Sequence, residues 1–148
     1  MKIPFLDLSV KDSGLKQELL AAVDRVLSHG RIVLGPEVGQ FEERIAQFCQ
    51  QKYAVGVNSG TDSLIFALKA LDIGPGDEVI TVPNSFVASA SAIRLVGAMP
   101  IFVDVGDDYN MDPDKVADAI TAKTRAILPV HLTGRACEME PLLSIAAE

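Results

Sequence analysis

The sequence predicts an α/β fold of three layers, α/β/α, with helices on both faces of a mainly parallel sheet. Short apolar runs rich in β-branched residues alternate with helical segments of roughly ten residues. Glycine, proline, asparagine and aspartate separate these segments. The short runs are apolar throughout, as strands buried on both faces are. We therefore expect βαβ units, in which ligands bind at the carboxyl ends of the strands.

Residues up to about 52 predict a helical arm that precedes the sheet. Asp12 or Ser13 can cap a first helix, which we expect to end at Gly30. Between the helices, residues 31–36 form an unusually apolar loop, which either packs over the core or forms the wall of a pocket or subunit interface. A second helix is indicated by apolar side chains at helical spacing: Val38, Phe41, Ile45 and Phe48.

Four strands are predicted, at residues 54–57, 78–82, 99–105 and 125–130. A helix should follow each of them, over 62–71, over 87–96, from Pro113 and from Pro141. Gly74 and Gly97 are expected to end the first two of these helices. The loops after the strands should share one edge of the sheet: 58–61, 83–86, 106–110 and 131–134.

The composition favours one compact globular domain. The chain has 148 residues, 49% of them hydrophobic and 22% charged, and its mean hydropathy is +0.27. A net charge of −7, without any cluster of Lys and Arg, argues against a nucleic-acid surface. The opening MKIPFLDL predicts neither a signal peptide nor a membrane span.

Cysteine and histidine are scarce. Cys49 and Cys137 lie far apart and predict reduced, packed thiols of a cytoplasmic protein rather than a disulfide framework. His29 and His131 are the only two histidines, which makes a histidine-based metal cluster improbable.

The turn Ser59-Gly60-Thr61 is the candidate ligand site. It lies between the predicted strand 54–57 and the following helix, where unpaired backbone N–H groups can bind a phosphate or carboxylate. The alternative is that Ser59 or Thr61 only caps the helix. The chain contains neither GxxxxGK[ST] nor a GxGxxG after a strand, so P-loop and dinucleotide sites lose their main support.

Several segments, in this order and spacing, resemble the DegT/DnrJ/StrS family of sugar aminotransferases, which are pyridoxal-phosphate enzymes of fold type I. The resemblance is carried by NSGTDSLIFALKALDIGPGDEVITVPNSFVASASAIRLVGAMPIFVDV, YNMDP and AILPVHLTG, and it extends to PFLDL and GPEVGQFEERIAQF. It implies that residues 1–148 are the N-terminal part of the large, pyridoxal 5′-phosphate-binding domain of an aspartate aminotransferase-like fold.

The resemblance also implies roles for individual residues. Ser59, Gly60 and Thr61 match the turn that holds the cofactor phosphate with backbone amides and the Thr hydroxyl. Phe86 matches the aromatic side chain that stacks on the pyridine ring; its alternative is a core residue. His131 lies in the family's Val-His-Leu stretch beside the cofactor, with a catalytic and a structural role both open. Ser63, where many relatives have Ala, is a mild departure.

The activity implied is transfer of an amino group from an amino acid, glutamate, to a nucleotide-linked keto sugar, by a full-length enzyme that is a homodimer. The aspartate that pairs with the pyridine nitrogen and the Schiff-base lysine are expected beyond Glu148. No lysine present matches that lysine, so the chain alone is expected to be inactive, and no catalytic residue is assigned. Two alternatives remain: a dehydratase of the same family, with His in place of that Lys, or a non-catalytic partner-binding domain.

Overall fold

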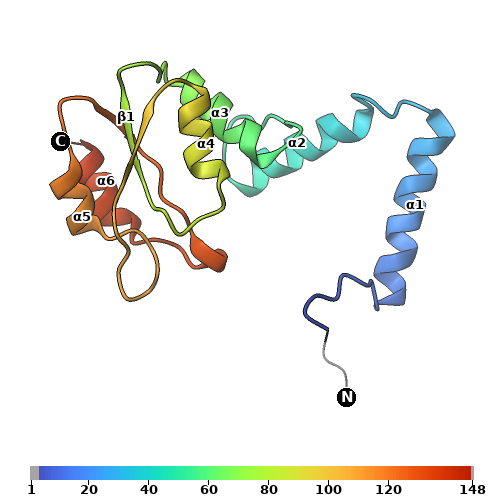
Figure 1. Ribbon diagram of the computed structural model, residues 1–148. Coiled ribbons are helices and arrows are strands. Elements are labelled where there is room, and N and C mark those ends of the chain that lie inside the picture. Colours follow the sequence, from blue (N-terminus) through green and yellow to red (C-terminus); the bar gives the residue numbers. More distant parts are fainter. Residues whose placement is uncertain (1–3, 148) are drawn as a thin grey trace. The chain divides into compact units, whose positions relative to one another are not determined.

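The computed structural model describes residues 4–147, and the chain forms two compact units, Met1–Gly56 and Val57–Glu148 (Figure 1). The first unit contains the two predicted helices, α1 (Ser13–His29) and α2 (Pro36–Phe48). Asp12 caps α1 by accepting a hydrogen bond from the Leu15 N–H across 2.7 Å, and Gly30 ends it in the left-handed conformation with φ 69°.

The apolar faces of this first unit are largely exposed. No residue of α1 is buried, and α2 buries Ala46 alone. In the loop 31–36 the side chains of Ile32, Val33 and Leu34 are all exposed within this unit. The two readings of the loop, packed over the core or forming the wall of a pocket or interface, both stay predictions.

The second unit contains a three-stranded parallel sheet, which confirms the predicted sheet type. Its strands are β1 (Glu78–Thr81), β2 (Met99–Phe102) and β3 (Thr124–Ile127), in the order β2-β1-β3. The central strand β1 therefore pairs on both sides, and the carboxyl ends of all three strands lie at one edge.

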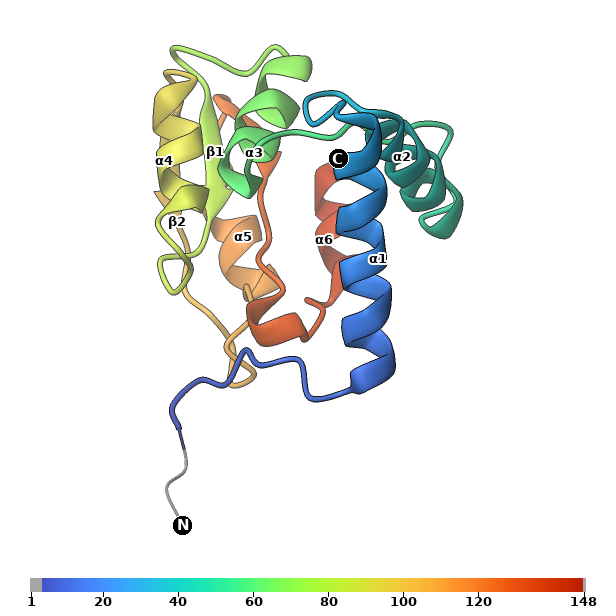
Figure 2. The same cartoon turned by 90° about the vertical axis from the view of Figure 1, so that its right-hand side faces the viewer.

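Helices cover both faces of this sheet, as the sequence predicts. α3 (Gly60–Ala70) and α4 (Ala88–Leu95) lie on one face, and α5 (Pro113–Ala119) and α6 (Met139–Ala147) on the other (Figures 1 and 2). Val79 of β1 packs with Leu68 and Ile93 on the α3/α4 side, whereas its neighbour Ile80 packs with Val116 and Leu142 on the α5/α6 side. These two apolar clusters form the core.

The predicted strand at residues 54–57 is not formed. A strand needs a neighbour to satisfy its backbone groups, and residues 54–57 pair with neither β2 nor β3. Val55 is 79% exposed, so the apolar run is not buried within the described structure. Apolar sequence alone predicted this strand wrongly because it does not reveal whether a pairing partner is present.

All three strands are shorter than predicted, and β1 ends only one residue early, at Thr81. β2 ends at Phe102, and the chain then forms an antiparallel bridge between Val105 and Met111 that closes the loop 106–110. β3 begins at Thr124 and ends at Ile127, two residues before Pro129, which has no N–H to donate to a ladder.

The end of α3 also differs from the prediction that Gly74 stops it. The helix ends at Ala70, and Asp72 adopts the left-handed conformation with φ 55°. The Ile73 N–H then donates to the Leu68 carbonyl across 3.1 Å, and both side chains are buried in one cluster. This hydrogen bond and apolar contact form a Schellman motif without glycine. α4, in contrast, ends at Leu95 and is closed by the left-handed Gly97, as predicted.

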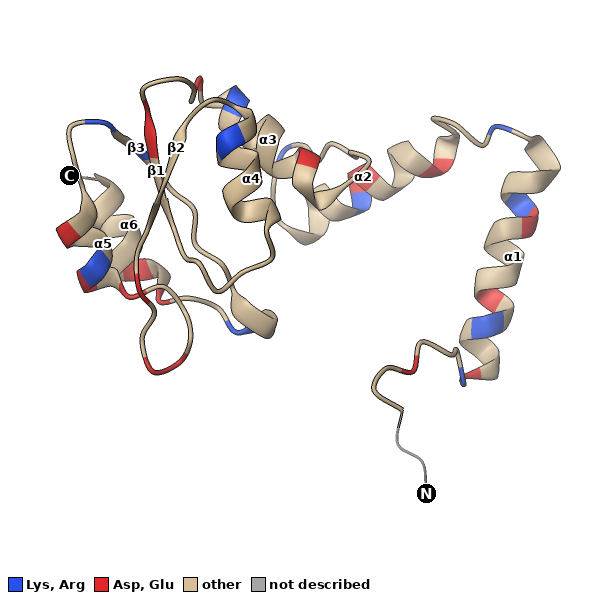
Figure 3. Cartoon of the chain, in the orientation of Figure 1, with Lys and Arg blue, Asp and Glu red and all other residues tan. Residues whose placement is uncertain are grey.

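Cys137 is buried as predicted, but Cys49 is exposed because it lies at the C-cap of α2, so the prediction of a packed thiol is wrong for Cys49. Acidic and basic residues are interspersed along α1, whereas the loop after β2 is acidic (Figure 3). Within residues 4–147, no helix is long and apolar enough to cross a membrane.

Candidate ligand site at the carboxyl edge of the sheet

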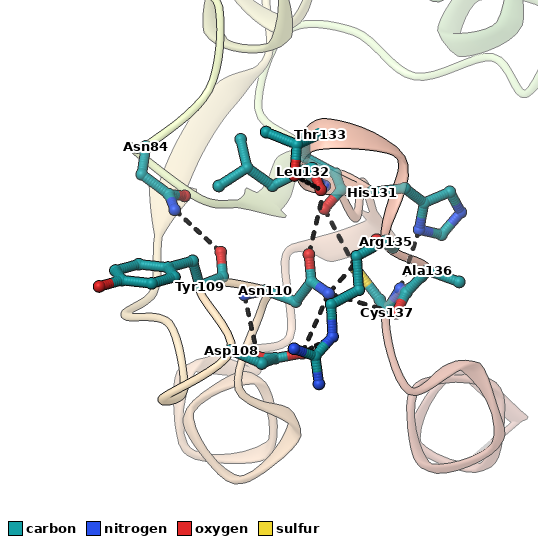
Figure 4. Close-up of polar contacts among 11 residues, drawn as sticks. Asn84, Asp108, Tyr109, Asn110, His131, Leu132, Thr133, Arg135, Ala136 and Cys137 are labelled. Atoms are coloured by element: carbon teal, nitrogen blue, oxygen red, sulfur yellow. Dashed lines mark hydrogen bonds and ion pairs between the residues drawn. The ribbon is translucent and has the colours of Figure 1, made fainter.

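Asparagine side chains connect the loops that follow the three strands. Asn84, after β1, donates from Nδ2 to the Tyr109 carbonyl in the loop after β2, across 2.9 Å (Figure 4). Asn110, in that same loop, accepts at Oδ1 from the Leu132 N–H after β3, across 3.2 Å. Three of the four loops predicted to share one edge are thus joined by hydrogen bonds.

Asn110 is the centre of this edge. Its side chain is 2% exposed, and Nδ2 donates to the carbonyls of Arg135 and Ala136 across 3.3 and 3.2 Å. The same nitrogen lies 3.0 Å from Asp108 Oδ2, and the Asn110 backbone N–H donates to Asp108 Oδ1 across 3.0 Å (Figure 4). One buried carboxamide therefore binds groups on both loops.

The carboxylate of Asp108 is held in its charged form. The backbone N–H of Asn110 is the main cause that lowers the pKa of Asp108 below its ordinary value of 3.8. The Asn110 amide and the charge of Arg135, whose Nε lies 3.5 Å from Oδ2, act in the same direction, and partial burial opposes them. This ionised group gives the Asn110 amide a charged acceptor.

His131 follows β3 and is exposed, but its ring is held on one side. The Cys137 N–H donates to its Nδ1 across 3.0 Å (Figure 4). A nitrogen that accepts a hydrogen bond carries no proton, so the neutral ring has its hydrogen on Nε2. Among residues 4–147, Nε2 has no hydrogen-bond partner.

At the start of α3, Ser59 is the N-cap. Its Oγ accepts from the Asp62 N–H across 3.1 Å and donates to the Asp62 carboxylate across 2.7 Å. The hydroxyl of Ser59 is therefore engaged within the helix. The Ser59 side chain therefore caps the helix, as the alternative reading expected. The backbone N–H groups of the turn remain available to bind a ligand.

Gly60 and Thr61 follow the cap, and the space around them and their backbone N–H groups decide whether the turn can accommodate a phosphate. Gly60 has no left-handed φ, and a Cβ built on it would meet nothing within 4 Å. The fold itself therefore gives no reason for glycine here, while the open space lets an anion approach the backbone closely. Among the described residues, the N–H groups of Gly60 and Thr61 donate to no protein acceptor. A phosphate-bearing cofactor suits this turn.

Phe86 follows β1 and is 77% exposed, so the core alternative for this residue is wrong. A largely exposed aromatic ring beside the carboxyl edge is available to cover a flat ligand. Its carbonyl accepts from the Ser89 N–H across 3.2 Å at the start of α4, which anchors its backbone.

Sequence reasoning missed Asn84 and Asn110. Both lie in loops that follow strands, at the edge where ligands bind, and that position was an available signal. The site residues are not all brought together: no hydrogen bond within residues 4–147 joins the turn 59–61 to the other three loops, and the sheet does not position this turn because 54–57 is not a strand. Within the same range, no group of three His, Cys, Asp or Glu side chains could hold a metal ion.

Comparison with known proteins extends these observations. The model of the DegT/DnrJ/EryC1/StrS aminotransferase family matches residues 14–148. The dTDP-3-amino-3,4,6-trideoxy-α-D-glucose transaminase of Streptomyces venezuelae is 47% identical over 146 residues, which are 98% of this chain and 38% of that protein. The UDP-2-acetamido-2-deoxy-3-oxo-D-glucuronate aminotransferase of Pseudomonas aeruginosa is 42% identical over 99% of this chain and 41% of its own length.

Solved structures agree in fold. DesV of S. venezuelae superimposes with a TM-score of 0.92 at 46% identity, covering 98% of this chain and 39% of DesV. NtdA of Bacillus subtilis, solved with bound cofactor PMP, gives a TM-score of 0.93 at 37% identity over 99% of this chain and 34% of NtdA. The chain thus has the α/β fold of these enzymes, and it spans about two fifths of the length of the curated relatives it matches.

Proposed function

The chain belongs to the DegT/DnrJ/EryC1/StrS aminotransferase family, and from that premise we propose that it forms the pyridoxal 5′-phosphate-binding part of a sugar aminotransferase. The whole enzyme transfers an amino group from an amino acid, glutamate, to a nucleotide-linked keto sugar. Relatives named as dTDP-sugar and UDP-sugar aminotransferases support the substrate class, and the PMP bound to NtdA supports the cofactor.

The observation that carries this proposal is the open turn at the start of α3. Gly60 leaves free space over the backbone, and the N–H groups of Gly60 and Thr61 lie at the positive end of the helix dipole. In the proposed site these groups and the Thr61 hydroxyl bind the cofactor phosphate. Ser59 stabilises the turn from within as the N-cap.

The remaining residues act on the cofactor ring. When bound, pyridoxal phosphate supplies a ring that withdraws electrons from the reacting carbon of the substrate. The exposed Phe86 ring covers one face of it and excludes water. Because Nδ1 of His131 already accepts from the Cys137 N–H, His131 donates a hydrogen bond to the cofactor from Nε2. This hydrogen bond fixes the orientation of the cofactor ring.

We also propose that the enzyme is a cytoplasmic homodimer. The exposed thiol of Cys49 suits a reducing compartment. Exposed apolar side chains on α1 and α2 supply surface for burial against the rest of the protein or a second copy: Leu15, Leu19, Val23, Leu27, Phe41 and Phe48.

The test uses the purified full-length protein that carries this chain, supplied with pyridoxal phosphate, L-glutamate and a nucleotide-linked keto sugar. We expect 2-oxoglutarate and amino sugar to form in equal amounts. Thr61→Ala should weaken cofactor binding by about 1.5–3 kcal/mol, the range for a hydrogen bond to a charged group, and Thr61→Ser should restore it. A sugar product that loses water without gaining nitrogen, or no cofactor binding, would overturn the proposal.

Borohydride trapping locates the lysine that holds the cofactor. After reduction of the loaded protein and peptide mapping, we expect the label on none of the seven lysines of this chain: Lys2, Lys11, Lys16, Lys52, Lys69, Lys115 and Lys123. Stoichiometric labelling of any one of them would contradict the assigned site.

A further inference from the structure

We propose that Asn110 is a positioning residue: it fixes the segment 131–137 and thereby presents His131 as a hydrogen-bond donor at Nε2, in a single ring tautomer. The inference rests on the proposed function only for the identity of the ligand, an oxygen acceptor of the cofactor. The hydrogen bonds that carry it lie entirely within the unit Val57–Glu148.

Asn110 holds both ends of this segment. Oδ1 accepts from the N–H of Leu132, the residue directly after His131, across 3.2 Å. Nδ2 donates to the carbonyls of Arg135 and Ala136, the two residues directly before Cys137, across 3.3 and 3.2 Å. Water does not replace these hydrogen bonds, because Asn110 is only 2% exposed.

The fixed segment in turn holds the imidazole. Cys137 donates from its backbone N–H to His131 Nδ1 across 3.0 Å (Figure 4). Its Sγ donates to the Val130 carbonyl across 3.2 Å. Val130 directly precedes His131, so the segment is closed at both of its ends. If the Cys137 N–H moved, Nδ1 would lose its donor and the neutral ring could exchange its hydrogen between the two nitrogens.

Only a carboxamide satisfies all the partners of residue 110. The site requires one acceptor, for the Leu132 N–H, and a donor facing the two carbonyls and the Asp108 carboxylate. An aspartate has the same shape but presents a second acceptor to these three oxygens. The expected result is repulsion that releases residues 135–137 and, with them, the ring of His131.

The test is ¹⁵N NMR of the histidine rings in the full-length protein without cofactor, so that it does not depend on activity. The His131→Gln variant assigns the signals. The parent should show well-separated Nδ1 and Nε2 shifts, with the hydrogen on Nε2. Asn110→Asp should move the two shifts toward each other as the tautomers mix. Asn84→Ala, which removes a hydrogen bond at the same edge but does not touch 131–137, should leave them unchanged.

A double variant separates positioning from general stability. Asp108→Asn combined with Asn110→Asp restores one amide–carboxylate pair and removes the carboxylate repulsion, so the unfolding midpoint should return toward that of the parent. It does not restore donors to Arg135 and Ala136, so the His131 tautomers should stay mixed. Averaged ring shifts in the parent, unchanged shifts in Asn110→Asp, or separated shifts in the double variant would each overturn the inference. Absence of cofactor binding would instead overturn the proposed function and leave these shifts as they are.

Discussion

Ser59 and Asp62 bind each other in both directions: Ser59 Oγ accepts from the Asp62 N–H across 3.1 Å and donates to the Asp62 carboxylate across 2.7 Å. Both hydrogen-bonding roles of this hydroxyl are therefore used inside α3. Ser59 therefore stabilises the helix, whereas its neighbours Gly60 and Thr61 are the residues that we propose bind the ligand.

Ser59→Ala should lower the free energy of unfolding by about 1 kcal/mol, because it removes the N-cap of α3. The measurement is urea unfolding of the parent and the variant. Ser63→Ala is the matched control, since the Ser63 hydroxyl donates only to the Gly60 carbonyl and is exposed. It should change the unfolding free energy by less than about 0.5 kcal/mol. Equal losses in both variants would show that the cap is not the relevant contact.

Gly60→Ala should leave the protein as stable as the parent or raise its unfolding free energy by up to about 1 kcal/mol, because the position is helical and the added Cβ meets nothing. The same Cβ should weaken binding of pyridoxal phosphate, since it fills the space over the backbone N–H groups. Urea unfolding and fluorescence titration measure the two effects. Retained cofactor affinity would mean that the phosphate binds elsewhere.

Phe86→Ala should weaken cofactor binding by about 1–3 kcal/mol, the magnitude of aromatic stacking on a base. The unfolding free energy should change by less than about 0.5 kcal/mol, because the side chain is 77% exposed. Phe66→Ala is the control: Phe66 is also exposed but lies on α3, and its loss should not change cofactor affinity. A large loss of stability in Phe86→Ala alone would favour a structural role.

The particular successes of sequence prediction have a common cause. Val79 and Ile80 lie next to each other in an apolar run and pack on opposite faces of the sheet, so a doubly covered parallel strand can be recognised from composition. Likewise, Asp12 and Gly30 mark the ends of α1 through local chemistry that needs no tertiary contact.

The failures depend on contacts between distant residues. Residues 54–57 are apolar enough for a strand, but pairing depends on a neighbour that their own sequence does not specify. α3 ends before Gly74 because Ile73 packs beside Leu68 and stabilises Asp72 in the left-handed conformation. In the site, the role of Asn110 depends on carbonyls 25 and 26 residues away in sequence, which no local pattern reveals.

Asp108 should contribute to stability in a pH-dependent way. Its folded-state pKa lies below the ordinary 3.8, so the stabilisation is present above that value and is lost as the pH falls through the folded-state pKa. Asp108→Asn should therefore reduce the loss of unfolding free energy below pH 3.8, as measured by urea unfolding over a pH series. Asp107→Asn, at an exposed neighbour in the same loop, is the control and should show the same loss of unfolding free energy with falling pH as the parent. If Asp108→Asn also showed the loss seen in the parent, other carboxylates would be responsible for it.

Binding of the cofactor phosphate at the start of α3 can be measured by ¹⁵N amide NMR of the full-length protein during titration with pyridoxal phosphate. We expect saturable shifts at the N–H signals of Gly60 and Thr61, weaker shifts with inorganic phosphate, and none with pyridoxal, which has no phosphate. Saturable binding of pyridoxal phosphate that leaves the Gly60 and Thr61 signals unchanged would show that the phosphate does not bind at the start of α3.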